Sequence, residues 1–143
     1  AIIVATGFEV YKPIDEQVYG YGRYDNVITS IEFERLILAA GPTGGKVVRA
    51  SDGKKPHSVV FIQCVGSRDL RRNEWCSGFC CMHSLKHAVM LKEKYKDDID
   101  VYVLYMEMRT PFKGYEEFYR RAREMGVNFI RGKASEIIED PVT

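Results

Sequence analysis

The sequence predicts an α/β protein, a doubly wound, Rossmann-like half-domain built on a parallel sheet. Three observations support this prediction. From residue 58 onward, apolar runs of strand length alternate with amphipathic helical patterns. The order is strand, helix, strand, helix, strand, and helical crossovers of this kind pair consecutive strands in parallel. With 143 residues, the chain is also long enough to bury a core of its own.

The residue patterns place three strands and two helices in this half-domain. The strands are apolar runs at 58–64, 100–108 and 127–131. The helices are expected from about Phe79 to Tyr95 and at 115–125. The second helix has the clearer signal, because acidic residues occupy its first turn, basic residues follow, and Gly126 stands at its end.

The first 57 residues are predicted to be less regular. Ala1–Gly7 has the pattern of a buried strand that stops at a Thr-Gly turn. Thr29-Ser-Ile-Glu32 fits a capping box that begins a helix reaching about Ala40, and Lys46–Ala50 is expected to form a short strand. We therefore divide the chain into residues 1–57, the end of a strand plus a connecting segment with one helix, and residues 58–143. Because the chain starts inside an apolar run without Met, we expect it to be part of a longer polypeptide.

Charge and hydropathy argue against several classes of function. The chain has 21 basic and 20 acidic residues and a net charge of +1, which gives no electrostatic case for binding nucleic acid or an anionic membrane. No stretch approaches the roughly 18 apolar residues of a membrane span, and no secretory signal pattern is present. Clustered cysteines without such a signal favour thiolate chemistry in a reducing compartment.

All four cysteines lie in one stretch, at Cys64, Cys76, Cys80 and Cys81. Cys64 ends a predicted strand, at the sheet edge where open parallel sheets bind ligands. A dinucleotide site would need G-x-G-x-x-G in the following turn, and the sequence has Cys-Val-Gly-Ser instead. Four thiolates suffice for a [4Fe–4S] cluster, and amides at the start of the next helix would stabilise its negative charge. Arg68, Arg71 and Arg72 would either add positive charge there or form a solvated loop.

Two other uses of these residues fit the spacing less well. A disulfide between Cys80 and Cys81 would be strained, because adjacent Cα atoms are about 3.8 Å apart. Structural zinc sites usually have paired C-x2–4-C knuckles. His83 and His87 are four residues apart on one helix face and could complete a zinc site, although such histidines are more often ordinary helix residues.

Two alternatives to an electron-transfer role follow from the same residues. A structural module with zinc or no metal would dock partner subunits through the exposed loops 8–28 and 109–114. A dithiol/disulfide enzyme is less well supported, because the sequence lacks C-x-x-C.

Three segments of the chain resemble the family of A-type subunits of heterodisulfide reductase. They are Gly53-Lys-Lys-Pro-x-x-Val-Val-Phe-Ile-Gln-Cys-Val-Gly-Ser-Arg-Asp69, Cys76-x-x-x-Cys-Cys-Met-His-Ser-Leu-Lys-His-Ala88 and Gly114-Tyr-Glu-Glu-Phe-Tyr-Arg-Arg-Ala-Arg-Glu124. The resemblance implies a large cytoplasmic oxidoreductase with FAD, iron–sulfur clusters and a thioredoxin-reductase-like core. It also implies electron transfer between the flavin and partners, namely other subunits of such complexes and carriers such as ferredoxin, with no nucleic acid and no membrane insertion.

The resemblance also implies roles for individual residues. The family's cluster ligands correspond to Cys64, Cys76, Cys80 and Cys81. Its Ala-Thr-Gly segment beside FAD corresponds to Ala5-Thr6-Gly7, so that Thr6 and Gly7 are the expected cofactor-binding residues. No catalytic residue is expected in this chain. The family's FAD-binding glycine motif and its ferredoxin-type cysteine motifs are absent from the sequence. This chain by itself is therefore expected to bind FAD weakly or not at all, and to be inactive.

Overall fold

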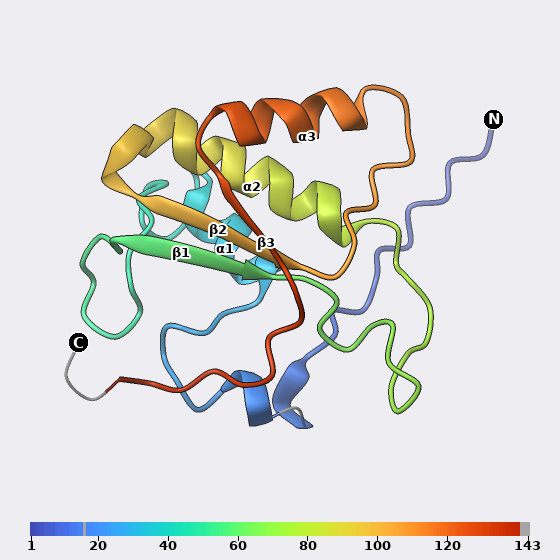
Figure 1. Cartoon of the computed structure of the whole chain (residues 1–143), viewed down its shortest axis with the longest axis horizontal. Helices are drawn as coiled ribbons and strands as arrows, with labels where there is room; N and C mark the ends of the chain where they lie inside the picture. The colour runs from blue at the N-terminus through green and yellow to red at the C-terminus, as the bar shows by residue number, and fades with distance from the viewer. Residues whose placement is uncertain (16, 141–143) are drawn as a thin grey trace.

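A computed structural model of the chain describes residues 1–15 and 17–140 (Figure 1). Three parallel strands form a sheet in the order β1 (Ser58–Ile62), β2 (Asp100–Tyr105) and β3 (Asn128–Arg131). Helix α2 (Cys80–Tyr95) connects β1 to β2, and helix α3 (Tyr115–Glu124) connects β2 to β3. The predicted α/β class and parallel sheet are confirmed. The remaining helices are α1 (Ser30–Ile37) and short 3-10 turns at Pro13–Asp15, Gln17–Tyr19 and Lys96–Asp98.

One face of the sheet packs against the helices. The register places Phe61, Val103 and Phe129 in one row across the three strands. Phe129 meets Tyr119 of α3 edge to face, with ring centroids 4.9 Å apart, and Val103 is completely buried. Figure 1 shows α2 and α3 side by side on this face of the sheet. Crossovers of one hand between consecutive parallel strands place successive helices on the same face in this way.

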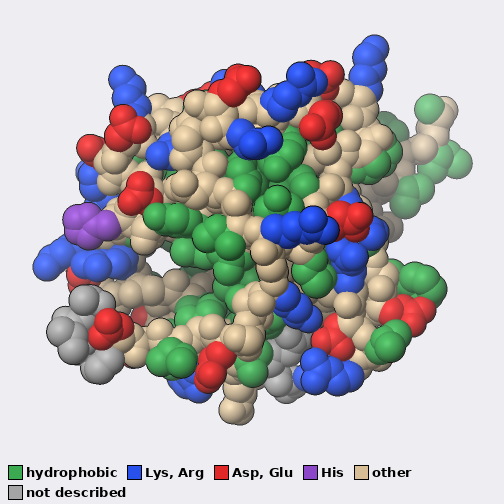
Figure 2. Space-filling view, viewed as in Figure 1, with side chains coloured by type: hydrophobic (Ala, Val, Ile, Leu, Met, Phe, Trp, Pro, Cys, Tyr) green, Lys and Arg blue, Asp and Glu red, His purple; other side chains and the backbone are tan. Residues whose placement is uncertain are grey.

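The opposite face of the sheet is less covered. The next row of the register, Ile62, Leu104 and Ile130, points away from the helices. Ile130 is 50% exposed, and Val60 on the same face is 51% exposed. Figure 2 shows hydrophobic side chains gathered in the middle of the viewed face, with charged side chains around them. The chain thus forms the half of a doubly wound arrangement in which helices cover one side of the sheet.

Helix α1 packs beside α2 and the end of β1, and it begins as predicted. The Glu32 amide donates to Thr29 Oγ1 over 3.3 Å, and the Thr29 amide donates to Glu32 Oε2 over 2.6 Å. This reciprocal pair is a capping box. Phe33 meets Phe61 edge to face, with ring centroids 5.4 Å apart, so that α1 enters the same core as the sheet. The helix ends at Ile37, earlier than the predicted Ala40.

Two predicted strands are not formed. Ala1–Gly7 is exposed and has no strand assignment, with Ile2 93% accessible to solvent. Lys46–Ala50 has no strand assignment either, although Val47 is buried in the core. A strand exists only when a neighbour accepts and donates its backbone hydrogen bonds, and none of the described strands pairs with either segment. Both predictions are wrong for this structure, and the division of the chain at residue 57 stays a prediction.

Among the described residues, no helix has the length and apolar character needed to cross a lipid bilayer.

Candidate functional site

The four cysteines lie in the turn from β1 to α2, as predicted. Cys64 follows the end of β1 and has a left-handed backbone, with φ at 60°. Cys76 lies in the loop, and Cys80 and Cys81 are the first two residues of α2. All four are free thiols; Cys64 and Cys81 are buried, and the other two are partly exposed.

Backbone amides from two segments donate to the cysteine sulfurs. The Gly78 amide lies 3.3 Å from Cys76 Sγ, and the Arg109 amide lies 3.5 Å from Cys81 Sγ. The Cys81 thiol in turn contacts the Glu107 carbonyl oxygen at 3.9 Å. Glu107 and Arg109 follow β2, so the carboxyl ends of two neighbouring strands both contribute to the site.

The thiols change one another's acidity. A hydrogen bond from the Cys81 thiol lowers the pKa of Cys80, and the same bond raises the pKa of Cys81. Burial raises the pKa of Cys64, and the nearby Cys80 charge adds to that rise. Cys80 begins a helix of 16 residues, whose N-terminal dipole favours negative charge. These effects favour the thiolate form of Cys80 over that of Cys64 or Cys81.

Arginine side chains supply positive charge beside the thiols. The Arg68 guanidinium opposes the effect of burial on the pKa of Cys64. Its Nη1 is buried and has no hydrogen-bond partner within the described part of the chain. Glu107 lies 3.4 Å from Arg68 Nη2 and 2.9 Å from Arg109 Nη2. A buried donor with no partner suits an anionic ligand. Arg71 instead pairs with Asp69 on the surface, at 2.9 Å.

The described thiols are not grouped as tightly as the ligands of a single zinc ion. One tetrahedral zinc ion holds sulfurs at about 2.3 Å from its centre, so its ligands crowd together. Among the described residues, no three cysteine sulfurs lie within 4.8 Å of one another. A [4Fe–4S] cluster takes one thiolate at each of four irons, and its ligands therefore stand farther apart. Four free thiols, two donating amides and an unpaired arginine donor fit that group.

Comparison with known proteins gives a clear relationship, although no family model matches the chain. The second A-type iron–sulfur subunit of the CoB–CoM heterodisulfide reductase of Methanopyrus kandleri is 58% identical over 146 residues, covering 100% of this chain. The corresponding A-type iron–sulfur subunit of Methanocaldococcus jannaschii is 54% identical over 144 residues, covering 99%. The chain belongs to the family of heterodisulfide reductase A-type subunits.

The chain matches one segment of these heterodisulfide reductase subunits. It spans 22% of the length of each of the two proteins just described. It spans 21% of the A-type subunit of the H2:CoB–CoM heterodisulfide,ferredoxin reductase of Methanothermobacter thermautotrophicus, at 51% identity. The resemblance to heterodisulfide reductase that the cysteine segment indicated is therefore confirmed.

Thr6 and Gly7, the residues that the family resemblance places beside FAD, lie apart from any described binding site. Both are exposed. Gly7 has a φ of +74°, and no described atom lies within 4 Å of the position a Cβ would take. No described residue packs around Gly7 to line a flavin site. The FAD site therefore stays a prediction from the family.

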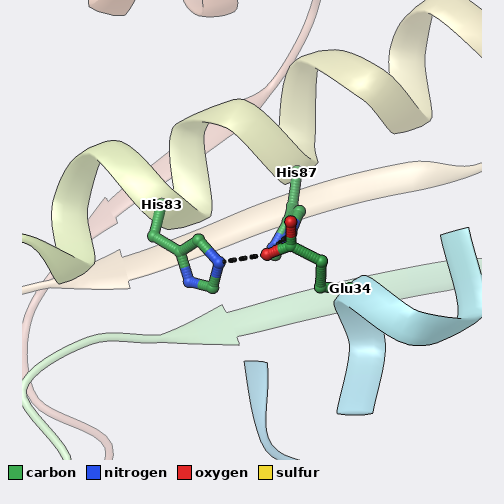
Figure 3. Close-up of side chains that lie close together, drawn as sticks. All are labelled: Glu34, His83 and His87. Carbon is green, nitrogen blue, oxygen red and sulfur yellow. Dashed lines mark hydrogen bonds and ion pairs between the residues drawn. The ribbon is translucent and has the colours of Figure 1, made fainter. Parts of the chain in front are cut away.

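His83 and His87 are brought together with Glu34 of α1 and not with a cysteine (Figure 3). Sequence reasoning missed Glu34, because it lies on a different helix, 49 residues before His83. It also missed Arg109, which reaches the cysteines only because β1 and β2 pair in parallel. No local motif marks either residue.

Proposed function

We propose that this chain is an iron–sulfur electron-transfer segment of a heterodisulfide-reductase-type oxidoreductase. Cys64, Cys76, Cys80 and Cys81 would hold a [4Fe–4S] cluster. The main support is the convergence of four free thiols on the carboxyl edge of a parallel sheet, where an α/β protein of this kind would otherwise hold a pyrophosphate. The names of the relatives, which describe an iron–sulfur subunit of a reductase, agree with this proposal.

When bound, the cluster would supply one-electron transfer, and the residues of the chain would tune it. The amides of Gly78 and Arg109 donate to the sulfurs of Cys76 and Cys81. Such bonds, together with the guanidinium groups of Arg68 and Arg109, stabilise added negative charge and so favour the reduced state. Cys64 and Cys81 are buried from water, whereas Cys76 and Cys80 are partly exposed, and we expect an electron partner to approach near these two.

In the whole protein, we propose that electrons pass between FAD and partner subunits in the cytoplasm, with FAD close to Thr6 and Gly7. Relatives are named for ferredoxin and for F420H2 as reaction partners, which supports carriers of this class. No acid–base residue is assigned, because one-electron transfer requires no proton at this site. The chain alone should be unable to complete a catalytic cycle.

Anaerobic purification followed by iron and sulfide analysis tests the proposal. We expect about four irons and four sulfides per chain, as a [4Fe–4S] cluster requires. Cys80→Ser should lower both counts sharply, while Ser135→Ala, at an exposed residue outside the site, should leave them unchanged. Zinc that is bound without sulfide and is lost in Cys80→Ser would support a structural docking module instead, as would a protein whose cysteines bind no metal.

A further inference from the structure

A second group of metal-ligating side chains lies along α2 from the cysteines (Figure 3). His83 and His87 are four residues apart on α2 and therefore share one face of the helix. Their ring centroids are 4.3 Å apart. Glu34 faces them from α1, and ligand atoms of the three side chains all lie within 4.8 Å of one another.

Both imidazoles meet the same carboxylate oxygen. His83 Nε2 lies 2.7 Å from Glu34 Oε2, a hydrogen-bond distance. His87 Nε2 lies 3.4 Å from that oxygen. Two nitrogens and one oxygen thus lie close together between α1 and α2.

His87 is the unusual member of this group. It is completely buried, and neither ring nitrogen has a hydrogen-bond partner among the described residues. Its 3.4 Å approach to Glu34 does not have hydrogen-bond geometry. Leaving a buried polar group unpaired costs about 1–3 kcal/mol, so native proteins rarely retain one without a use. An ion between the three side chains would give His87 Nε2 the partner that it lacks.

The surroundings of the group suit a cation held by neutral imidazoles. The rings of Phe33 and Phe61 flank His87, with centroids 5.1 and 6.2 Å away. Aromatic walls favour the uncharged imidazole, which is the form that ligates metals. Lys86 Nζ lies 2.6 Å from the other carboxylate oxygen, Oε1, and fixes the orientation of Glu34. The positive charge of Lys86 would weaken cation binding, but Glu34 Oε2 stays directed at the histidines.

One member of the group reaches the protein surface. The Glu34 side chain is 29% exposed, whereas the two histidines lie beneath it. An ion would approach the two buried imidazoles from the side of this carboxylate. It would leave one coordination position on the solvent side for water.

We propose that Glu34, His83 and His87 bind a divalent transition-metal ion of the zinc class. Two imidazoles and one carboxylate are a ligand set that zinc takes with a fourth position open. Binding would replace the hydrogen bond between His83 and Glu34 and would join α1 to the helix that begins with Cys80. This site shares no ligand with the proposed cluster, so either proposal can fail without the other.

Cobalt(II) titration of the anaerobic, metal-free protein tests this site. Cobalt bound by nitrogen and oxygen gives weak visible bands, whereas cobalt bound by thiolates adds an intense sulfur-to-metal band in the near ultraviolet. We expect one cobalt ion that gives only the weak bands. Zinc should displace it and raise the thermal unfolding midpoint, because an ion that binds only the folded state stabilises it.

Two variants separate metal binding from folding. His87→Phe keeps a ring among Phe33 and Phe61 and removes the unpaired nitrogens, so it should fold while cobalt binding weakens more than about tenfold. Glu34→Gln should weaken binding in the same way. His57→Ala removes the third histidine of the chain, which is exposed, and should bind as the wild type does. Cobalt that shows only thiolate bands, or binding unchanged in His87→Phe, would overturn the proposal.

Discussion

The ring of Tyr11 lies directly against Gly66, in the loop that follows Cys64. A Cβ added to Gly66 would stand 2.2 Å from Tyr11 Cε1, far inside van der Waals contact. Gly66 also has a φ of +67°, a left-handed conformation that side chains disfavour. The contact joins the N-terminal segment to the cysteine loop, and glycine is required there both by the backbone and by the neighbouring ring.

Replacing Gly66 should therefore destabilise this part of the protein. Gly66→Ala is expected to lose about 1–2 kcal/mol from the backbone conformation alone, and more from displacing Tyr11. Gly53→Ala is the matched control, because Gly53 has a φ of +70° and no described atom within 4 Å of an added Cβ. Urea unfolding measures both. Equal losses in the two variants would mean that the Tyr11 contact does not restrain the loop.

The capping box of α1 gives a second prediction. Thr29→Ala removes the hydroxyl that accepts the Glu32 amide hydrogen and should lower the free energy of unfolding by about 1 kcal/mol. Ser30→Ala changes a neighbouring exposed hydroxyl and should have an effect below about 0.5 kcal/mol. Chemical denaturation of the two variants checks the difference. A loss in Ser30→Ala as large as that in Thr29→Ala would argue against the cap.

The alternating strands and helices could be predicted from the sequence, because the patterns that mark them are local. Apolar runs of strand length identified strands β1, β2 and β3, helical periodicity identified both crossover helices, and the capping box identified the start of α1. The strand expected at Ala1–Gly7 failed for a physical reason. An apolar run shows only that a segment could pair, while a strand forms only where a neighbouring strand is present.

The candidate site likewise has a part that the sequence predicts and a part that it does not. The four cysteines could be assigned to one edge, because they lie close together in the sequence and flank one strand end. Arg109 and Glu34 could not, since each reaches the site through tertiary packing, across 28 residues to Cys81 and 49 residues to His83. Long-range contacts of this kind leave no trace in residue spacing.

The buried face of α2 gives a third prediction. Leu85 is completely buried in the core, so Leu85→Ala should cost about 2–5 kcal/mol through lost contacts and a cavity. Leu70 lies in the cysteine loop and is 86% exposed, so Leu70→Ala should change stability by less than about 0.5 kcal/mol. Thermal or urea unfolding measures both. Similar values for the two leucines would contradict the placement of α2.

The charge of Arg109 should set the reduction potential of the proposed cluster. Its amide donates to Cys81 Sγ, while its guanidinium pairs with Glu107 at 2.9 Å and lies near Cys76. Arg109→Gln keeps the amide but removes the positive charge and leaves Glu107 less neutralised. Both changes disfavour adding an electron, so the midpoint potential should become more negative.

A redox titration followed by electron paramagnetic resonance measures this shift. Arg120→Gln removes an equal charge from the exposed face of α3 and should leave the potential nearly unchanged, because solvent screens a distant surface charge. Glu107→Gln should shift the potential in the opposite direction, since it removes a negative charge beside the same thiols. If Arg109→Gln and Glu107→Gln shift the potential in the same direction, charge at this sheet edge does not control the cluster. The amides that donate to the sulfurs would then be the dominant influence.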